Sequence, residues 1–205
     1  MNIVFLGAPG TGKGTIAARC AKEQGFNQIS PGDLFRQEVN KGTEIGIKVK
    51  VLLEKGILVP LEITNALVKN AIKKNNIFDG YPRTLEQGNT LDIFLKIDAA
   101  ILFQMSEDQI VERLAGRRVC PKCQSIYHLK NVKPKKTGIC DKCKTPLIQR
   151  NDDKHDVIRN RFKIYNEQTS PLIEFYKKKG ILKIIDASKD PDEEYEEVKR
   201  IIKVK

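Results

Sequence analysis

The sequence has no tryptophan, few aromatic residues (6%) and no long apolar run among its 205 residues. A membrane-spanning helix needs about 20 consecutive apolar residues, so we expect no such span. No basic region precedes the first apolar run and no cleavage site follows it, which argues against a secretory signal. The sequence also lacks internal repeats and low-complexity tracts. With 40% hydrophobic and 31% charged residues, the composition is that of a soluble globular protein, and we expect it in the cytoplasm.

Acidic residues are outnumbered, with 26 Asp and Glu against 37 Lys and Arg and a net charge of +11. Such an excess suits either nucleic acid or small polyphosphate ligands. Aromatic residues that would stack on bases are not interleaved with the basic ones. Much of the excess lies in lysine pairs and runs, at 73–74, 135–136 and 177–179. We therefore expect solvated lysine-rich faces and no nucleic-acid partner.

The first fifteen residues carry the strongest local signal. An apolar run, Ile3 to Leu6, is typical of a strand buried on both faces of a sheet. Four glycines and Lys13 follow, and then a helix-forming stretch from Ile16 to Lys22. Glycines let backbone N–H groups converge on an anion, and the start of a helix adds further donors. Strand, glycine loop and helix together predict a nucleotide-phosphate site, the alternative being a tight glycine turn.

The loop fits the pattern G-x-x-x-x-G-K from Gly7 to Lys13, with one departure. Gly14 stands where the pattern has Ser or Thr, and Thr15 comes one residue later. The usual direct hydroxyl ligand of Mg²⁺ is therefore displaced, while the phosphate loop itself is complete.

The rest of the chain alternates between strand-like and helix-like stretches, which predicts an α/β fold with a parallel sheet flanked by helices. We expect further strands at 27–29, 77–78, 99–105 and 181–186. We expect further helices from residue 30 to 41 and at 45–55, 64–74, 84–92, 107–114, 157–179 (interrupted near Pro171) and 192–204. Ligands of such folds lie beyond the carboxyl ends of the strands, where the glycine loop and the segment 79–83 both fall.

Two acidic residues follow predicted strands. Asp79 ends a buried strand, where it can orient water around Mg²⁺ or merely cap the next turn. Ser30 and Asp33 resemble a helix capping box, with Pro31 at the first helical position. Arg36 lies one turn beyond Asp33 on the same face of that helix.

Four cysteines form two C-x2-C pairs with sixteen residues between them: Cys120, Cys123, Cys140 and Cys143. This spacing predicts a tetrahedral zinc site, structural because four thiolates leave no open position. Iron fits the same ligands, and two disulfides are an alternative that an intracellular chain disfavours. The surrounding segment has few large apolar residues, so the metal would hold it together. We expect Cys20 to be a small buried residue and His128 to be a packing residue.

Four motifs, in this order and spacing, resemble those of the adenylate kinases over essentially the whole chain. They are GAPGTGKGT at 7–15, DGYPRT at 79–84 with Gln87 four residues after Arg83, GRRV at 116–119 and RNDD at 150–153. The cysteine segment resembles the zinc-bearing lid of the long-form members. The resemblance implies a monomer with a five-stranded parallel sheet of the P-loop nucleoside monophosphate kinase type. Its core would comprise residues 1–29, 60–115 and 154–205, with an AMP-binding insertion at 30–59 and a zinc-binding lid at 116–153.

The resemblance also implies the reversible reaction of Mg·ATP with AMP to give two ADP, and it assigns residues to each substrate. ATP would be bound by Gly10, Thr11, Gly12, Lys13, Gly14, Thr15, Arg117, Ile126, Tyr127 and Lys189. AMP would be bound by Pro31, Arg36, Ile57, Leu58, Val59, Gly80, Tyr81, Pro82, Arg83, Gln87, Arg150 and Arg161. The catalytic charges would be those of Lys13, Arg83, Arg117, Arg150 and Arg161. Asp79 would organise the water shell of Mg²⁺, and Asp152 would help to order the lid.

These residue types suit phosphoryl transfer, which requires mainly positioning and neutralisation of charge on phosphate oxygens. Two positions depart from the family pattern: Pro31 replaces a hydroxyl residue beside the AMP base, and Tyr81 replaces Phe. Another nucleoside monophosphate kinase, with UMP or CMP as acceptor or GTP as donor, is the nearest alternative. A zinc-ribbon nucleic-acid-binding protein would explain the cysteines and the charge but not the glycine loop.

Overall fold

The computed structural model describes residues 1–202, with residue 155 described by its backbone alone. Its centre is a parallel five-stranded sheet in the order β2-β3-β1-β4-β7. The strands are β1 (Asn2–Leu6), β2 (Asn27–Ile29), β3 (Asn76–Asp79), β4 (Ala99–Gln104) and β7 (Leu182–Asp186). In register, Ile3 of the central strand lies between Ile77 and Ala99. The predicted fold class is confirmed.

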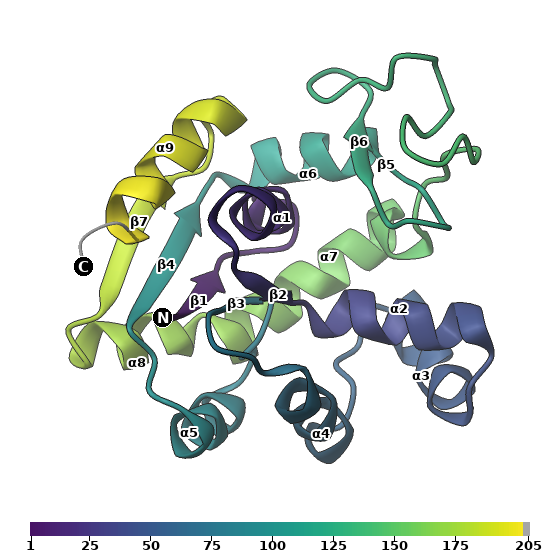
Figure 1. Cartoon of the computed structure of the whole chain (residues 1–205). Helices are drawn as coiled ribbons and strands as arrows, with labels where there is room; N and C mark the ends of the chain where they lie inside the picture. Colours follow the sequence, from purple (N-terminus) through teal and green to yellow (C-terminus); the bar gives the residue numbers. More distant parts are fainter. Residues whose placement is uncertain (203–205) are drawn as a thin grey trace.

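The apolar strands fill two cores because alternate side chains point to opposite faces of the sheet. Ile3 and Phe5 pack against α1 (Lys13–Gln24) and α9 (Pro191–Ile202). Val4 and Leu6 pack on the other face, which α4 (Leu61–Ala71), α5 (Leu85–Phe94) and α8 (Pro171–Lys178) cover. Helices thus lie on both faces, which buries nearly all of the central strands β3, β1 and β4 (Figure 1). Cys20 is buried in the first core, as expected.

Two smaller units project from one end of the sheet (Figure 1). The first is a pair of helices, α2 (Pro31–Lys41) and α3 (Glu44–Glu54), which pack around Phe35, Val49 and Val59. The second is the cysteine segment, which contains the antiparallel strands β5 (Arg117–Val119) and β6 (Ile126–His128). α6 (Glu107–Gly116) leads into this segment, and a 3₁₀ turn (Asn151–Asp153) and α7 (His155–Ile164) lead out of it.

The long helix predicted at 157–179 is interrupted as expected. α7 passes into a π-helical turn (Tyr165–Thr169), where the Ser170 N–H donates to Tyr165 O at 2.8 Å, and α8 starts at Pro171. The terminal helix starts at Pro191 and is described as far as Ile202, so residues 203–204 of its predicted span lie outside the described residues. None of the helices within residues 1–202 is long and apolar enough to cross a bilayer.

Candidate active site

The glycine loop connects β1 to α1 in a backbone conformation that demands glycine. Gly7, Gly10 and Gly12 have φ values of +140°, +94° and +90°, a region that other residues rarely adopt. A Cβ at Gly7 would lie 2.6 Å from Phe103 O, and one at Gly10 would lie 2.8 Å from Leu114 Cγ. Gly12 is the residue that caps α1. The loop and the first turn of α1 line a cleft of about 210 Å³.

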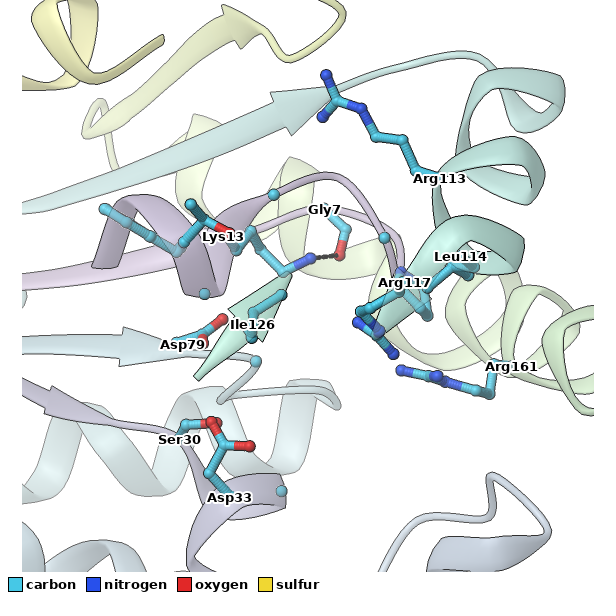
Figure 2. Close-up of a pocket in the computed structure, with 18 of the residues that line it drawn as sticks. Gly7, Lys13, Ser30, Asp33, Asp79, Arg113, Leu114, Arg117, Ile126 and Arg161 are labelled. Carbon is cyan, nitrogen blue, oxygen red and sulfur yellow. Dashed lines mark hydrogen bonds between the residues drawn. The ribbon is translucent and has the colours of Figure 1, made fainter. Parts of the chain in front are cut away.

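Lys13 is buried, and its ammonium is held by its own loop. Its Nζ donates to Gly7 O and Ala8 O at 2.7 Å each and to Thr11 Oγ1 at 3.1 Å (Figure 2). Burial lowers the pKa of Lys13 to about 7, with Asp79 opposing this shift and nearby arginines adding to it. Phosphate oxygens in the cleft would supply the negative charge that the buried ammonium lacks.

Six arginines from separate parts of the chain line the same cleft: Arg36, Arg83, Arg113, Arg117, Arg150 and Arg161. Arg117 and Arg161 lie close together in Figure 2. Burial lowers the pKa values of Arg150 and Arg161 to about 10, and neighbouring arginines add to the shift. The Arg83 loop is held by the π-helical turn, where Thr169 Oγ1 donates to Arg83 O at 2.9 Å. The cleft therefore concentrates positive charge that suits a polyphosphate.

Two carboxylates at the end of the cysteine segment balance part of this charge. Asp153 pairs with Arg117, whose Nε donates to Asp153 Oδ2 at 2.7 Å. Asp152 Oδ2 lies 3.0 Å from Arg161 Nη1. Burial alone would raise the pKa of Asp152, but Arg161 and other arginines outweigh it and hold the pKa below its usual value. These pairs keep the guanidinium groups oriented in the absence of substrate.

Asp33 joins the helix pair to the end of the cysteine segment. Its Oδ1 lies 2.5 Å from Arg36 Nη2 and 3.3 Å from Arg150 Nη2. Burial would raise the pKa of Asp33, but the two arginines outweigh it and lower the pKa. Ser30 and Pro31 take the predicted capping and first helical positions. The capping box predicted for Ser30 and Asp33 was wrong, because the Ser30 side chain makes no capping hydrogen bond and the Asp33 carboxylate pairs with the two arginines instead.

Asp79 ends β3 beside the glycine loop. In register it lies opposite Phe5, and its Oδ2 accepts a hydrogen bond from Gln28 Nε2 at 3.2 Å. Burial raises the pKa of Asp79, with Lys13 opposing the shift. A Cβ at Gly14 would lie 3.1 Å from Asp79 Oδ2, so a larger residue at position 14 would crowd this carboxylate.

A second, smaller cavity of about 80 Å³ adjoins the cleft and contains most of the residues assigned to AMP. It is lined by Pro31, Arg36, Ile57, Leu58, Val59, Gly80, Tyr81, Arg83, Gln87 and Arg161. Gln87 Oε1 accepts from the Arg83 N–H at 2.7 Å, which presents the amide nitrogen as the donor group for a ligand. Tyr81 is buried and donates to Asn65 Oδ1 at 2.7 Å. Pro82 and Arg150 line the larger cleft instead.

The four cysteines lie together, with every sulfur within 4.8 Å of the others. Sγ–Sγ distances are 3.2 Å for Cys120–Cys143 and 3.5 Å for Cys123–Cys140. A tetrahedral ion with bonds of about 2.3 Å would place sulfurs about 3.8 Å apart, so the donor set fits zinc. All the cysteines are free thiols. His128 is not part of this sulfur cluster, and its Nδ1 accepts from the Lys130 and Asn131 N–H groups at 3.1 Å each.

Comparison with known proteins agrees with this geometry. The family model described as adenylate kinase matches residues 5–181. The chain belongs to the adenylate kinase family. Adenylate kinases of Thermotoga neapolitana and Archaeoglobus fulgidus are 46% and 44% identical to it, each over 98% of this chain and over 96% and 98% of their own lengths. A third, from Fervidobacterium nodosum, is 46% identical over 94% of this chain and 93% of its own.

Membership makes the chain an ATP:AMP phosphotransferase, an enzyme that uses Mg·ATP, and nothing in these comparisons favours another acceptor or a nucleic-acid function. Two of the residues assigned to ATP, Thr11 and Lys189, do not line the cleft. Thr11 is buried behind the loop, where its hydroxyl donates to Ala8 O at 3.0 Å. Lys189 Nζ lies 3.5 Å from Glu197 Oε2, and its carbonyl accepts from Arg113 Nη2 at 3.3 Å.

The structure adds two residues to the site of this adenylate kinase family member that the sequence did not reveal. Arg113 and Glu194 both line the cleft, with Arg113 Nη2 3.5 Å from Glu194 Oε1. Glu194 is buried, and burial raises its pKa to about 7. No sequence motif pointed to Arg113 or Glu194, because charged residues occur all along the amphipathic helices that contain them.

Proposed function

We propose that the larger cleft binds Mg·ATP, that the smaller cavity binds AMP, and that transfer takes place where the two meet. The observation that carries this proposal is that Lys13 lines the larger cleft together with a cluster of arginines, and that three of these arginines, Arg36, Arg83 and Arg161, also line the smaller cavity. Charge spreads over the oxygens of the transferred group, so fixed cations at this position stabilise the transition state. The acceptor is already a phosphate oxygen, and no general base is required.

On the donor side, the backbone N–H groups of Gly10 to Thr15 would hold the phosphates of ATP. Lys13 would leave its loop carbonyls for a phosphate oxygen. Arg117, Ile126 and Tyr127 would close over the nucleotide from the lid, and Lys189 would contribute its backbone carbonyl. Ile126 lies near the loop, because a Cβ at Gly14 would be in van der Waals contact with Ile126 Cδ1 at 3.7 Å.

On the acceptor side, Arg36, Arg83, Arg150 and Arg161 would bind the phosphate of AMP. Gln87 would read the adenine edge, and Ile57, Leu58, Val59, Gly80, Tyr81 and Pro82 would form the walls. Asp33 now neutralises Arg36 and Arg150. We infer that the AMP phosphate displaces Asp33 from at least one of these arginines, which frees planar bidentate donors for it.

Two metal ions complete the proposal. Mg²⁺, which neutralises phosphate charge, would be held through water by Asp79, whose carboxylate is already oriented by Gln28. A structural Zn²⁺ would bind to Cys120, Cys123, Cys140 and Cys143. Thiols that bind a metal must stay reduced, as they do in the cytoplasm. We therefore propose the cytoplasm as the location of this protein.

We propose three functional units: a core of residues 1–29, 60–115 and 154–205, an AMP-binding insertion at 30–59 and a lid at 116–153. Insertion and lid meet over the cleft, where Asn40 Nδ2 donates to Pro121 O at 3.2 Å. Closure of this kind excludes water, which would otherwise accept the phosphoryl group. Each unit comes from one chain, so a monomer suffices for activity.

The test is ADP production from Mg·ATP with AMP, UMP, CMP and GMP offered in parallel. We expect rapid turnover with AMP and little with the others. Turnover with several acceptors would show that Pro31 has relaxed the base cavity, and Pro31→Thr should then restore selectivity. Absence of turnover with every acceptor would refute the proposal.

A further inference from the structure

Tyr127 lies between the cysteine cluster and the nucleotide cleft. It is the middle residue of β6, and its ring is buried against Cys120 and Cys140, with Leu147 packed beside them. It also lines the cleft. A tyrosine carries a hydroxyl that must find partners when it is buried. The partners of this hydroxyl are both in the second cysteine pair.

Tyr127 Oη accepts a hydrogen bond from the Asp141 N–H at 2.8 Å and lies 3.5 Å from Cys140 Sγ. Its own hydrogen is then free to point at the sulfur. A metal-bound cysteine is a thiolate and has no hydrogen to give, so in the loaded protein the phenol must be the donor. Donors to a ligating sulfur tune a metal site and hold its ligands in place.

The neighbouring residue, Ile126, reaches the glycine loop. Side chains alternate along a strand, so Tyr127 and Ile126 point to opposite sides of β6. Ile126 Cδ1 lies 3.7 Å from where a Cβ at Gly14 would be, and Figure 2 shows Ile126 beside Lys13 and Asp79. Val119 lies opposite Ile126 in the hairpin, which fixes the position of the strand relative to the first cysteine pair. β6 therefore connects the metal cluster to the phosphate loop.

We propose that Tyr127 is a positioning residue, whose hydroxyl fastens β6 to the metal-bearing second cysteine pair and so places Ile126 against the phosphate loop. Metal occupancy then sets the affinity for the donor nucleotide. This inference rests on the zinc site and the donor-side lid proposed above. It assigns a role to the Tyr127 hydroxyl, a group that phosphate binding does not need.

The test is Tyr127→Phe, which removes only the hydroxyl and keeps the buried ring. Metal transfer to a chromogenic chelator should become about 10-fold faster or more, as for other residues that support metal ligands. In the Co²⁺-loaded protein, the thiolate-to-cobalt absorption band should shift. KM for ATP should rise several-fold while KM for AMP is unchanged. The matched control is Tyr176→Phe, a buried tyrosine in α8 far from the lid, which should change none of these.

A second pair of variants keeps the inference testable if Tyr127→Phe does not fold. Asp141→Pro removes the N–H that orients the hydroxyl, and the first cysteine pair has Pro121 at the equivalent position. Asp141→Ala retains the N–H and removes only the carboxylate, which accepts from the Lys135 N–H at 2.9 Å. Metal release should be faster in the proline variant than in the alanine variant.

Metal content of the wild-type protein is measured first. If that protein holds no metal, the zinc site itself fails. If it holds one equivalent and Tyr127→Phe releases it at the wild-type rate with an unshifted cobalt band, the inference is overturned. Equal rises in KM for ATP and AMP would also overturn it, since they indicate a general loss of structure.

Discussion

At the scale of single residues, Lys13 combines function with a cost in stability. Its ammonium is buried, and its pKa is lowered to about 7. For a lysine, a folded pKa below the unfolded one means that folding is penalised at every pH below about 10.4, where the unfolded chain is protonated. A charged lysine in the cleft therefore lowers the stability of the fold, and phosphate binding offsets this cost.

We expect Lys13→Met to lower kcat by about 10²-fold or more, because a cation that stabilises transferring charge is lost. The melting temperature at pH 7 should stay the same or rise, because the buried charge disappears. ADP formation and thermal unfolding by circular dichroism measure the two effects. A large fall in melting temperature would contradict the second expectation, and near-normal turnover would contradict the first.

Glu194 gives a prediction on pH. Burial raises its pKa to about 7, with Asp186 and Asp190 adding to the shift and Arg113 opposing it. Because the pKa of Glu194 is higher in the folded than in the unfolded chain, the folded state binds the proton more tightly. Its contribution to stability is therefore greatest below the pKa of the unfolded chain and is lost as the pH rises through about 7. Between pH 5 and pH 8, wild-type stability should therefore fall relative to Glu194→Gln by on the order of 2 kcal/mol. Urea unfolding at both pH values tests this, and parallel curves would contradict it.

At the scale of elements, the two cysteine pairs are built alike. Cys120 N–H donates to Ser125 O at 3.0 Å, and Cys140 N–H donates to Thr145 O at 2.9 Å. The residue after each pair has a positive φ, +59° at Gln124 and +60° at Lys144. Left-handed backbone costs about 1 kcal/mol for residues with a Cβ. The cysteine segment therefore carries strain at two equivalent positions.

Lys144→Gly should relieve one of these strains and stabilise the cysteine segment by about 0.5–1 kcal/mol. Lys142→Gly, two residues earlier and outside the left-handed region, is the control and should destabilise it. Metal retention against a chelator during heating measures both. Equal effects of the two substitutions would show that the backbone strain is not the cause.

Elements with strong periodicity were predictable from sequence, and residues with distant partners were not. The strand of Ile3 to Leu6 was evident because both of its faces are buried, which leaves an unbroken apolar run. The spacing of Ser30 and Asp33 predicted a capping box because that pattern is local, whereas one partner that Asp33 has in the structure, Arg150, lies 117 residues away. Thr11 belongs to the phosphate motif, yet the positive φ values around it turn its hydroxyl back into the loop. Such orientations depend on tertiary packing.

At the scale of the whole molecule, the core and the cysteine segment differ in what holds them together. Two large apolar clusters fill the faces of the sheet. The apolar cluster of the cysteine segment is small, with Cys120, Tyr127 and Cys140 buried and Cys143 and Leu147 beside them, and Val119 is the one further buried apolar residue described in the segment. A segment with so little apolar burial depends on its metal for stability.

Metal removal should therefore lower the melting temperature and open the segment 116–153 before the core. Trypsin should first cut at exposed lysines of this segment, such as Lys135 and Lys136, while far-ultraviolet circular dichroism retains the helical signal. Protein purified without chelators should contain about one equivalent of metal. Simultaneous loss of both regions, or a substoichiometric metal content, would contradict this expectation.

The strand order β2-β3-β1-β4-β7 also governs how the protein is made. Four strands of the described sheet lie within the first 104 residues, so they leave the ribosome before the cysteine segment and long before β7. β7 joins at the β4 edge, which lets it add to a sheet that has already formed, without threading. Until then, that edge is an open row of backbone donors and acceptors beside Ala100 and Leu102. A nascent chain paused between Gln104 and Leu182 therefore presents a site that chaperones and aggregating chains both recognise.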